Sequence, residues 1–307
     1  MEILYFLESI RNPVLDVIMS FITLFGDETL FMALAMLMFW CVDKYRGYLV
    51  LCVGFIGTII NQFLKLAFRI PRPWVKDPNF TIVESAREAA TGYSFPSGHT
   101  QNAVGTFGSI GVTAKRKAAR IACLVLAILV PFSRMYLGVH TPLDVGVSIL
   151  IAAALVAVLT PLMKSIEKQP HKMSYLLWAM LALSLAYTLF VTIYKFPADI
   201  DKHNLESGMK NAYTLLGAIA GMCIAYPIET KHIRFNTHAV WWAQIIKLVV
   251  GLGLTVGIKA GLKVVFNIIF GADFMPAHAI RYALMVLFAA LVWPLTFKFF
   301  SRLGSKK

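Results

Sequence analysis

Three short segments of this mostly apolar chain carry charged side chains at the ends of apolar runs. The segment KLAFRIPRP contains Lys65 and Arg72, FPSGH contains His99, and SRMYLGVHTPLD contains Arg134 and Asp144. Charged groups near membrane depth are costly, so such residues mark a functional site by default. We therefore expect the three segments to converge on one site.

The three cations of these segments suit a multivalent anion. Lys65, Arg72 and Arg134 have few acids nearby in sequence and would repel one another unless an anion lay among them. The planar fork of arginine fits phosphate oxygens. Phosphate is therefore the predicted ligand, and the alternative for each cation alone is an anchor for lipid head groups.

The second segment has the residues of a helix N-terminus that binds an anion. Pro96 is expected at the first helical position, and the unpaired N–H groups and positive dipole end of such a helix attract anions. Ser97 adds a hydroxyl, while Gly98 places no side chain in the way. His99 could exchange a proton with the group that carries the anion. The alternative is an ordinary N-cap beside an interfacial histidine.

The third segment places a second histidine beside a carboxylate. Thr141 is expected to be the N-cap, Pro142 the first residue and Asp144 the third residue of the next helix, close to His140. An aspartate bonded to one imidazole nitrogen sets the tautomer and makes the other nitrogen more nucleophilic. The pattern predicts an activated nucleophile, unless Asp144 only caps its helix and bonds to His140.

These segments must be positioned by helices in a membrane. The chain has 307 residues, of which 58% are hydrophobic and 15% charged, and a bilayer favours helices for such apolar runs. We expect an all-α polytopic bundle of about nine transmembrane helices. The expected spans are 25–42, 47–67, 94–113, 119–137, 143–163, 174–194, 212–228, 239–258 and 281–300.

The distribution of charge predicts orientation and partners. The net charge of +13 falls at the ends of apolar runs, which favours anionic lipid and phosphate over nucleic acid. The basic loop 115–120 is expected on the cytoplasmic side, which places the three segments on the extracytoplasmic face. The four cysteines lie in apolar runs without C-x-x-C spacing, so we expect buried packing residues and neither disulfides nor a metal site.

The three segments together resemble the signature of the type 2 phosphatidic acid phosphatase superfamily. The matching patterns are Lys65-x6-Arg72-Pro73, Pro96-Ser97-Gly98-His99 and Ser133-Arg134-x5-His140-x3-Asp144. The superfamily includes lipid phosphate phosphatases, bacterial undecaprenyl pyrophosphate phosphatases, glucose-6-phosphatases and the vanadium haloperoxidases. The resemblance covers residues 25–165, about half of the chain, and implies that they contain a six-helix phosphatase core.

The resemblance implies a role for each signature residue. His140 is the expected nucleophile, Asp144 its orienting partner, and His99 the acid that protonates the leaving oxygen. No metal ion or other cofactor is needed, because positive side chains stabilise the phosphoryl oxygens. The expected phosphate cradle consists of Lys65, Arg72, Ser97, Gly98 and Arg134.

The predicted function is a membrane phosphatase acting on a lipid phosphomonoester or pyrophosphate, in the cytoplasmic membrane of a bacterium. Alternatives are a phosphatase of a water-soluble sugar phosphate and a non-catalytic protein that binds or transports lipid phosphate. Residues 1–24 are expected to form an amphipathic interfacial segment. Residues 170–307 would wall a groove for the lipid, restrict the substrate or form a homo-oligomer interface.

Overall fold

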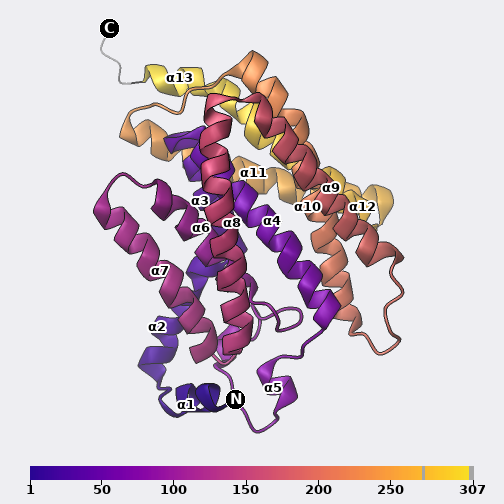
Figure 1. Ribbon diagram of the computed structural model, residues 1–307. Coiled ribbons are helices and arrows are strands. Elements are labelled where there is room, and N and C mark those ends of the chain that lie inside the picture. Colours follow the sequence, from indigo (N-terminus) through magenta and orange to yellow (C-terminus); the bar gives the residue numbers. More distant parts are fainter. Residues whose placement is uncertain (272–273, 304–307) are drawn as a thin grey trace. The chain divides into compact units, whose positions relative to one another are not determined.

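The protein is built from helices. A computed structural model describes residues 1–271 and 274–303, and 81% of the protein is helical. Within these ranges there is no strand, and the helices form the polytopic bundle that the apolar runs predict (Figure 1). The predicted fold class is therefore confirmed, as expected where the backbone must satisfy its own hydrogen bonds.

The helices are spaced along the whole chain. Its first half forms α1 (Glu2–Ser9), α2 (Pro13–Thr23), α3 (Glu28–Leu37), α4 (Lys44–Phe68), α5 (Pro73–Lys76), α6 (Gly98–Thr113), α7 (Lys117–Tyr136) and α8 (Pro142–Lys168). Its second half forms α9 (His171–Ile193), α10 (Lys202–Ile228), α11 (Trp241–Phe270), α12 (Pro276–Leu287) and α13 (Phe297–Arg302).

The number of long apolar spans is smaller than the nine predicted. Among the described residues, seven helical stretches can cross a membrane by length and composition, and Pro13–Gly26 with Glu28–Val42, bent by 52°, would make an eighth. The difference lies at α6, which forms where a span was predicted but has only 16 residues and includes several Gly, Thr and polar side chains. A helix of that length falls short of the hydrocarbon thickness.

The chain divides into two compact units. The first contains Met1–Ala35, Leu49–Leu162 and Ile200–Leu205, and the second contains Met36–Tyr48, Met163–Asp199 and Glu206–Lys307. All three polar segments of the predicted site belong to the first unit.

In the first unit, α6 is held against α7 and the end of α2. Gly26 allows this close approach, because a Cβ atom there would lie 2.7 Å from the His99 carbonyl oxygen. The apolar cluster between α6 and α7 comprises Ala103, Phe107, Cys123 and Val130. This packing fixes the start of α6, where the second polar segment lies.

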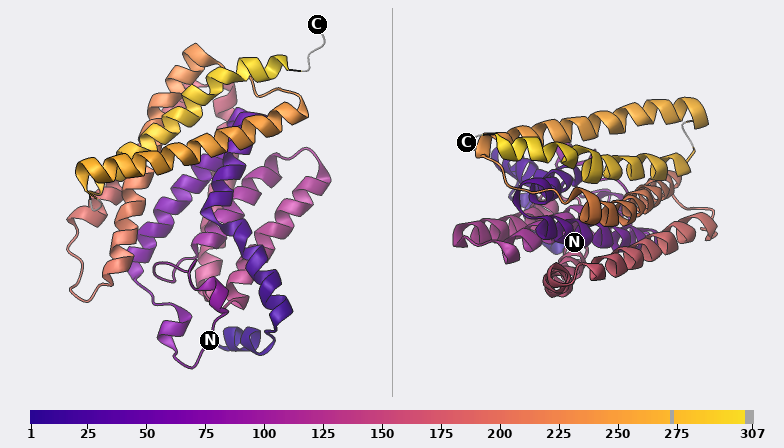
Figure 2. Two further views of the ribbon diagram at one scale, coloured as in Figure 1. Left: turned by 180° about the vertical axis from the view of Figure 1, so that it is seen from behind. Right: turned by 90° about the horizontal axis from the view of Figure 1, so that it is seen from above.

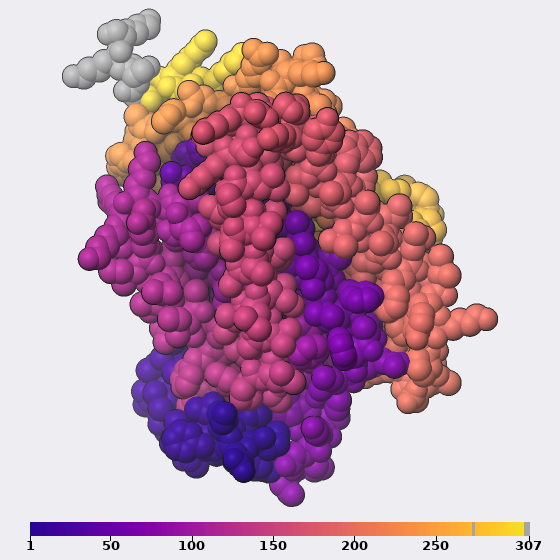
Figure 3. All heavy atoms as spheres, viewed as in Figure 1, coloured from indigo at the N-terminus to yellow at the C-terminus, as the bar shows by residue number. Residues whose placement is uncertain are grey.

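The outer side of α7 is apolar and exposed. Ile121, Leu124 and Ile128 are spaced three or four residues apart and all are exposed. In Figure 3, α7 is the magenta helix on the outer face of the first unit. A continuous apolar helix face of this kind suits contact with lipid tails.

The loop between α5 and α6 is anchored to the chain around it. Arg11 donates to the carbonyl oxygens of Tyr136 and Thr81, at 2.9 and 2.8 Å. The Val83 N–H group donates to the Leu137 carbonyl oxygen at 3.1 Å. These bonds tie the loop that precedes the second segment to the end of α7, which carries the third.

The second unit has its own polar and aromatic core. Lys44 forms an ion pair with the buried Glu229. The Trp40 indole donates to the Ala289 carbonyl oxygen at 2.9 Å, and that of Trp293 donates to Lys247 O at 3.2 Å. Helices α11 and α12 lie side by side in both views of Figure 2. Partnered indoles of this kind allow large aromatic groups inside a core.

The four cysteines are free. Cys52 and Cys123 are buried, which agrees with a packing role. Cys41 and Cys223 are only partly buried, so the prediction that all four are buried is wrong for these two. Apolar side chains on a membrane helix can face lipid instead of the protein interior, and the sequence does not distinguish the two surroundings.

Candidate active site

The second polar segment forms a helix start with Ser97 as its cap. Helix α6 begins at Gly98, and the Ser97 hydroxyl accepts a hydrogen bond from the Thr100 N–H group at 3.4 Å. Pro96 was expected at the first helical position, but it precedes the cap. The reason is a tertiary contact: Ser97 has an extended backbone, and its N–H group donates to the Asp144 carbonyl oxygen at 3.2 Å. The space that a Cβ atom on Gly98 would fill is open.

The third segment starts α8 as its residues predict. Pro142 is the first helical residue, and the Asp144 N–H group donates to the Thr141 hydroxyl at 3.3 Å. In return, the Thr141 N–H group donates to Asp144 Oδ2 at 2.7 Å. This reciprocal pair caps the helix and fixes the carboxylate at its N-terminus.

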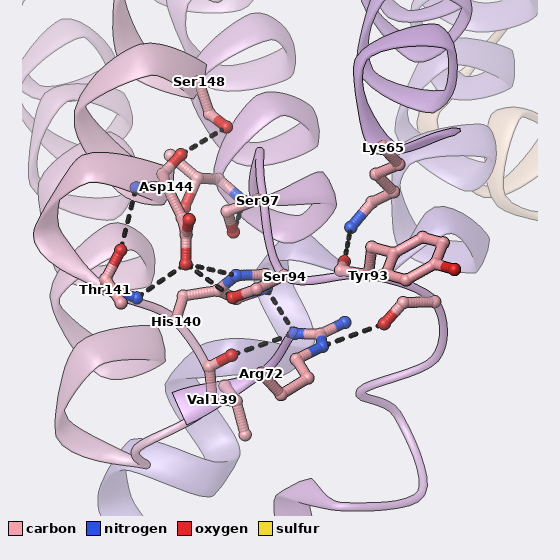
Figure 4. A network of polar contacts seen from close by, with 12 residues as sticks. Lys65, Arg72, Tyr93, Ser94, Ser97, Val139, His140, Thr141, Asp144 and Ser148 are labelled. Carbon is pink, nitrogen blue, oxygen red and sulfur yellow. Dashed lines mark hydrogen bonds and ion pairs between the residues drawn. The ribbon is translucent and has the colours of Figure 1, made fainter. Parts of the chain in front are cut away.

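The same carboxylate faces the imidazole of His140. Asp144 Oδ2 lies 3.5 Å from His140 Nδ1, and both residues are 1% exposed. On the other side of the ring, Arg72 Nη1 lies 2.9 Å from Nε2 (Figure 4). A guanidinium can only donate, so Nε2 accepts and the proton of the neutral ring resides on Nδ1, toward Asp144. Capping and orientation are therefore compatible roles of one carboxylate.

The charge state of His140 follows from its surroundings. Burial lowers the pKa of His140 well below its ordinary value, and the nearby charges of Arg72, Arg134 and Lys65 lower it further. The ring is consequently neutral at neutral pH. A neutral ring with Nε2 unprotonated is the form in which an imidazole can act as a nucleophile.

The cations of the first segment bind main-chain carbonyl groups of the loop before α6. Lys65 donates to the carbonyl oxygen of Tyr93. Arg72 donates to the carbonyl oxygens of Thr91 at 2.6 Å and Gly92 at 3.1 Å, and Nη1 also donates to the Val139 carbonyl oxygen at 2.9 Å. Both side chains are buried and point toward the same loop (Figure 4).

Arg134 completes the set of cations from the end of α7. It is fully buried, and its Nη1 donates to the Thr23 hydroxyl of α2 at 2.9 Å, while Nε has no hydrogen-bond partner. Asp144 is the only buried carboxylate among the described residues of the first unit. The site thus holds more positive than negative charge, which favours a multivalent anion.

The structure brings the predicted site residues together. Arg72, Arg134, Lys65 and His99 all lie near enough to His140 to act on its pKa. Ser97 contacts Asp144, and the partly exposed His99 and Gly98 follow it on α6.

Sequence reasoning missed two contacts of the site. Ser94 donates to Asp144 Oδ2 at 2.6 Å, and Thr23 binds Arg134. Ser94 lies two residues before the Pro-Ser-Gly-His pattern. This position could have identified it as a residue near the site. Thr23 offered no signal, because nothing in the sequence of α2 distinguishes it.

Comparisons with known proteins place the chain in a family. Residues 45–168 match the PAP2 superfamily, and residues 213–306 match the transmembrane extension of PAP2 superfamily phosphatases. The sequence motifs gave no sign of that extension. No solved structure matches the chain.

The relatives of the chain are phosphatases. It is 32% identical over 150 residues to undecaprenyl-diphosphatase BcrC of Bacillus subtilis. This match covers 46% of this chain and 72% of that protein. It is 30% identical over 149 residues to phosphatidylglycerophosphatase B of the same organism, covering 44% and 69%. A probable sphingosine-1-phosphate phosphatase of Dictyostelium discoideum is 31% identical over 160 residues, covering 48% and 38%. The chain therefore belongs to the PAP2 superfamily and is one of its membrane-embedded phosphatases.

Proposed function

We propose that this phosphatase hydrolyses a phosphomonoester or pyrophosphate of a lipid through a phosphohistidine intermediate on His140. The observation that carries the proposal is the placement of the imidazole between Asp144 at Nδ1 and Arg72 at Nε2. That placement directs the lone pair of Nε2 toward the cation that would hold the phosphoryl group.

Binding uses the donors of the phosphate cradle. The phosphoryl oxygens take the place of main-chain carbonyl groups as acceptors for Lys65 and Arg72, because a charged oxygen accepts more strongly than a neutral one. Arg134 contributes its unpartnered Nε, and the Ser97 hydroxyl and first N–H groups of α6 complete the set. Fixed donors of this kind stabilise the charge that develops on the oxygens during transfer.

The reaction then proceeds in two steps. As Arg72 Nη1 transfers its hydrogen bond from Nε2 to a phosphoryl oxygen, the freed Nε2 lone pair of His140 attacks phosphorus, and the bond to the leaving oxygen breaks while His99 donates a proton to that oxygen. The product is a lipid alcohol, or a lipid monophosphate if the substrate is a pyrophosphate. Asp144 stabilises the positive imidazole. His99 next takes a proton from water, whose oxygen attacks phosphorus while the Nε2–phosphorus bond breaks, which frees His140 and releases inorganic phosphate.

We also propose the setting of this chemistry. The substrates of the relatives are an undecaprenyl diphosphate, a phosphatidylglycerophosphate and sphingosine 1-phosphate, which supports a lipid whose tail stays in the bilayer. The site faces the extracytoplasmic side of a bacterial cytoplasmic membrane. Residues 25–165 form the phosphatase core, 1–24 lie at the interface, and 170–307 add further transmembrane helices.

The test is phosphate release from a panel of substrates by the purified protein in detergent with EDTA. The panel contains undecaprenyl diphosphate and monophosphate, phosphatidic acid, phosphatidylglycerol phosphate, sphingosine 1-phosphate and glucose 6-phosphate. We expect release from at least one lipid and a preference over glucose 6-phosphate. Preference for the sugar phosphate would contradict the substrate class, and binding without release would favour a transport protein.

The nucleophile is tested by His140→Ala. We expect turnover to fall by about 10²- to 10⁴-fold or more, since loss of a nucleophile removes the covalent step. An acid-labile phosphoenzyme should form from labelled substrate in the unsubstituted protein and be absent from the variant. His203→Ala, which removes an exposed histidine of α10, is the matched control. Near-normal turnover of His140→Ala would refute the assignment.

A further inference from the structure

Asp144 is held by a serine that the proposed mechanism does not use. We propose that Ser94 is a positioning residue: its hydroxyl holds the Asp144 carboxylate toward His140 Nδ1 during turnover. The inference rests on the proposed role of His140 as nucleophile. It assigns a function to a residue outside the three signature patterns.

Three groups converge on one oxygen of Asp144. Oδ2 accepts from the Ser94 hydroxyl at 2.6 Å and from the Thr141 N–H group at 2.7 Å, and it lies 3.5 Å from His140 Nδ1 (Figure 4). Ser94 and Asp144 are 0% and 1% exposed. A short hydrogen bond between a hydroxyl and a carboxylate in a buried site is strong, because water cannot replace it.

The cap alone leaves the carboxylate free to turn. The Thr141 N–H group comes from the same helix start as Asp144, so this bond holds the carboxylate to its own helix. The 3.5 Å separation from Nδ1 exceeds ordinary hydrogen-bond length, so the imidazole holds it only weakly. Ser94 comes from a different segment, so its hydrogen bond restrains the carboxylate from a second direction. Together the two donors define one orientation of Oδ2.

Ser94 is itself fixed on both sides. Its N–H group donates to the Ile70 carbonyl oxygen at 2.8 Å, two residues before Arg72. Three residues further on, the Ser97 N–H group donates to the Asp144 main-chain oxygen at 3.2 Å. The serine therefore connects the segments that carry the cation, the cap of α6 and the acid. A hydroxyl held in this way can keep a partner within the narrow tolerance that catalysis requires.

The primary test compares Ser94→Ala with Ser148→Ala. Ser148 is an equally buried serine whose hydroxyl donates to the main-chain oxygen of Asp144 at 2.9 Å and not to its carboxylate. We expect Ser94→Ala to lower kcat by about 10- to 100-fold, the range for a lost hydrogen bond to a charged group, with KM changed less than about threefold. Ser148→Ala should keep kcat within about threefold, at a similar change in Tm. Equal kcat in both variants would overturn the proposal.

A double-mutant cycle separates positioning from general destabilisation. Asp144→Asn removes the charge that Ser94 orients, so Ser94→Ala added to Asp144→Asn should lower kcat by no more than about twofold further. A full additional loss of about tenfold or more would show that Ser94 acts elsewhere, and would refute the inference.

A second pair of variants keeps the inference testable if Ser94→Ala does not fold. Ser94→Thr retains the hydroxyl, while Ser94→Val introduces a side chain of the same shape as threonine but without a hydroxyl. We expect the threonine variant to have at least about tenfold higher kcat than the valine variant, in line with one lost charge-assisted bond. Equal kcat would contradict the inference. If His140→Ala is inactive in the same assay, the proposed function stands even when the Ser94 inference fails, whereas an active His140→Ala refutes the proposed function itself.

Discussion

Replacing Arg72 by lysine separates the charge of the phosphate cradle from its geometry. The guanidinium uses three nitrogens to reach four acceptors: His140 Nε2, and the carbonyl oxygens of Val139, Gly92 and Thr91. A lysine keeps the positive charge but donates from a single nitrogen, so it cannot reproduce the fork. We expect Arg72→Lys to fold, because the charge stays and the volume is similar, and to lose most of its activity.

The size of the loss follows from the number of bonds. An ammonium at the end of the lysine chain can donate in about two of the four directions, so at least two of the charge-assisted bonds that the guanidinium would give to phosphoryl oxygens are lost. At about 1.5 kcal/mol each, the low end for such bonds, the barrier rises by about 3 kcal/mol. Since about 1.4 kcal/mol corresponds to tenfold in rate, kcat/KM should fall by about 10²-fold.

The assay is the initial rate of phosphate release from the preferred lipid in mixed micelles, with Tm measured in parallel. Arg87→Lys is the matched control, because Arg87 forms a two-bond ion pair with Glu84 at an exposed position. Arg87→Lys also removes a guanidinium that donates two hydrogen bonds. It should leave kcat/KM within about twofold, since exposed ion pairs contribute little to stability. If Arg72→Lys retained kcat/KM within about threefold at unchanged Tm, the geometry of the fork would be irrelevant and the argument would be refuted.

Three further predictions concern the two imidazoles and the cradle. His99→Ala should lower turnover by about 10²- to 10⁴-fold, because both protonation of the leaving oxygen and activation of water are lost; turnover equal to that of the His203→Ala control would exclude its role. Vanadate should inhibit, because its trigonal bipyramidal form resembles the transferring phosphoryl group, and full activity at about 1 mM would count against the cradle. Burial lowers the pKa of His140, so protonation of Nε2 should reduce kcat/KM only below about pH 6.5, the ordinary histidine value. If the NMR signal of the His140 ring titrated above that pH, the assignment of a neutral imidazole at neutral pH would be wrong.

Much of the bundle could be predicted because apolar runs between charged breaks have only one stable form in a bilayer. The prediction of a membrane span failed at α6, because Gly98, Thr100, Gln101 and other small or polar residues lie between its apolar residues. The start of α6 was displaced by two residues from Pro96, since a tertiary bond to Asp144 holds Ser97 in an extended conformation. Local rules for helix starts contain no information about such a bond.

The candidate site was predictable where spacing along one segment determines contact. His140 and Asp144 are four residues apart at a helix start, so their proximity follows from the sequence alone. The contacts of Ser94 and Thr23 join residues 50 and 111 positions apart in sequence from their partners. Such contacts depend on how helices pack, and one sequence carries no direct signal for them.

The carbonyl groups that hold Lys65 and Arg72 also impose a threshold on any anion that arrives. Both cations already have neutral oxygen partners, so a newcomer must be a better acceptor than a peptide group to displace them. A terminal phosphate with two negative charges meets that condition easily. The phosphodiester head groups of ordinary membrane lipids carry one charge shielded by substituents on both sides and compete poorly. An enzyme surrounded by phospholipid can in this way remain available for the lipids with a terminal phosphate that we propose as its substrates.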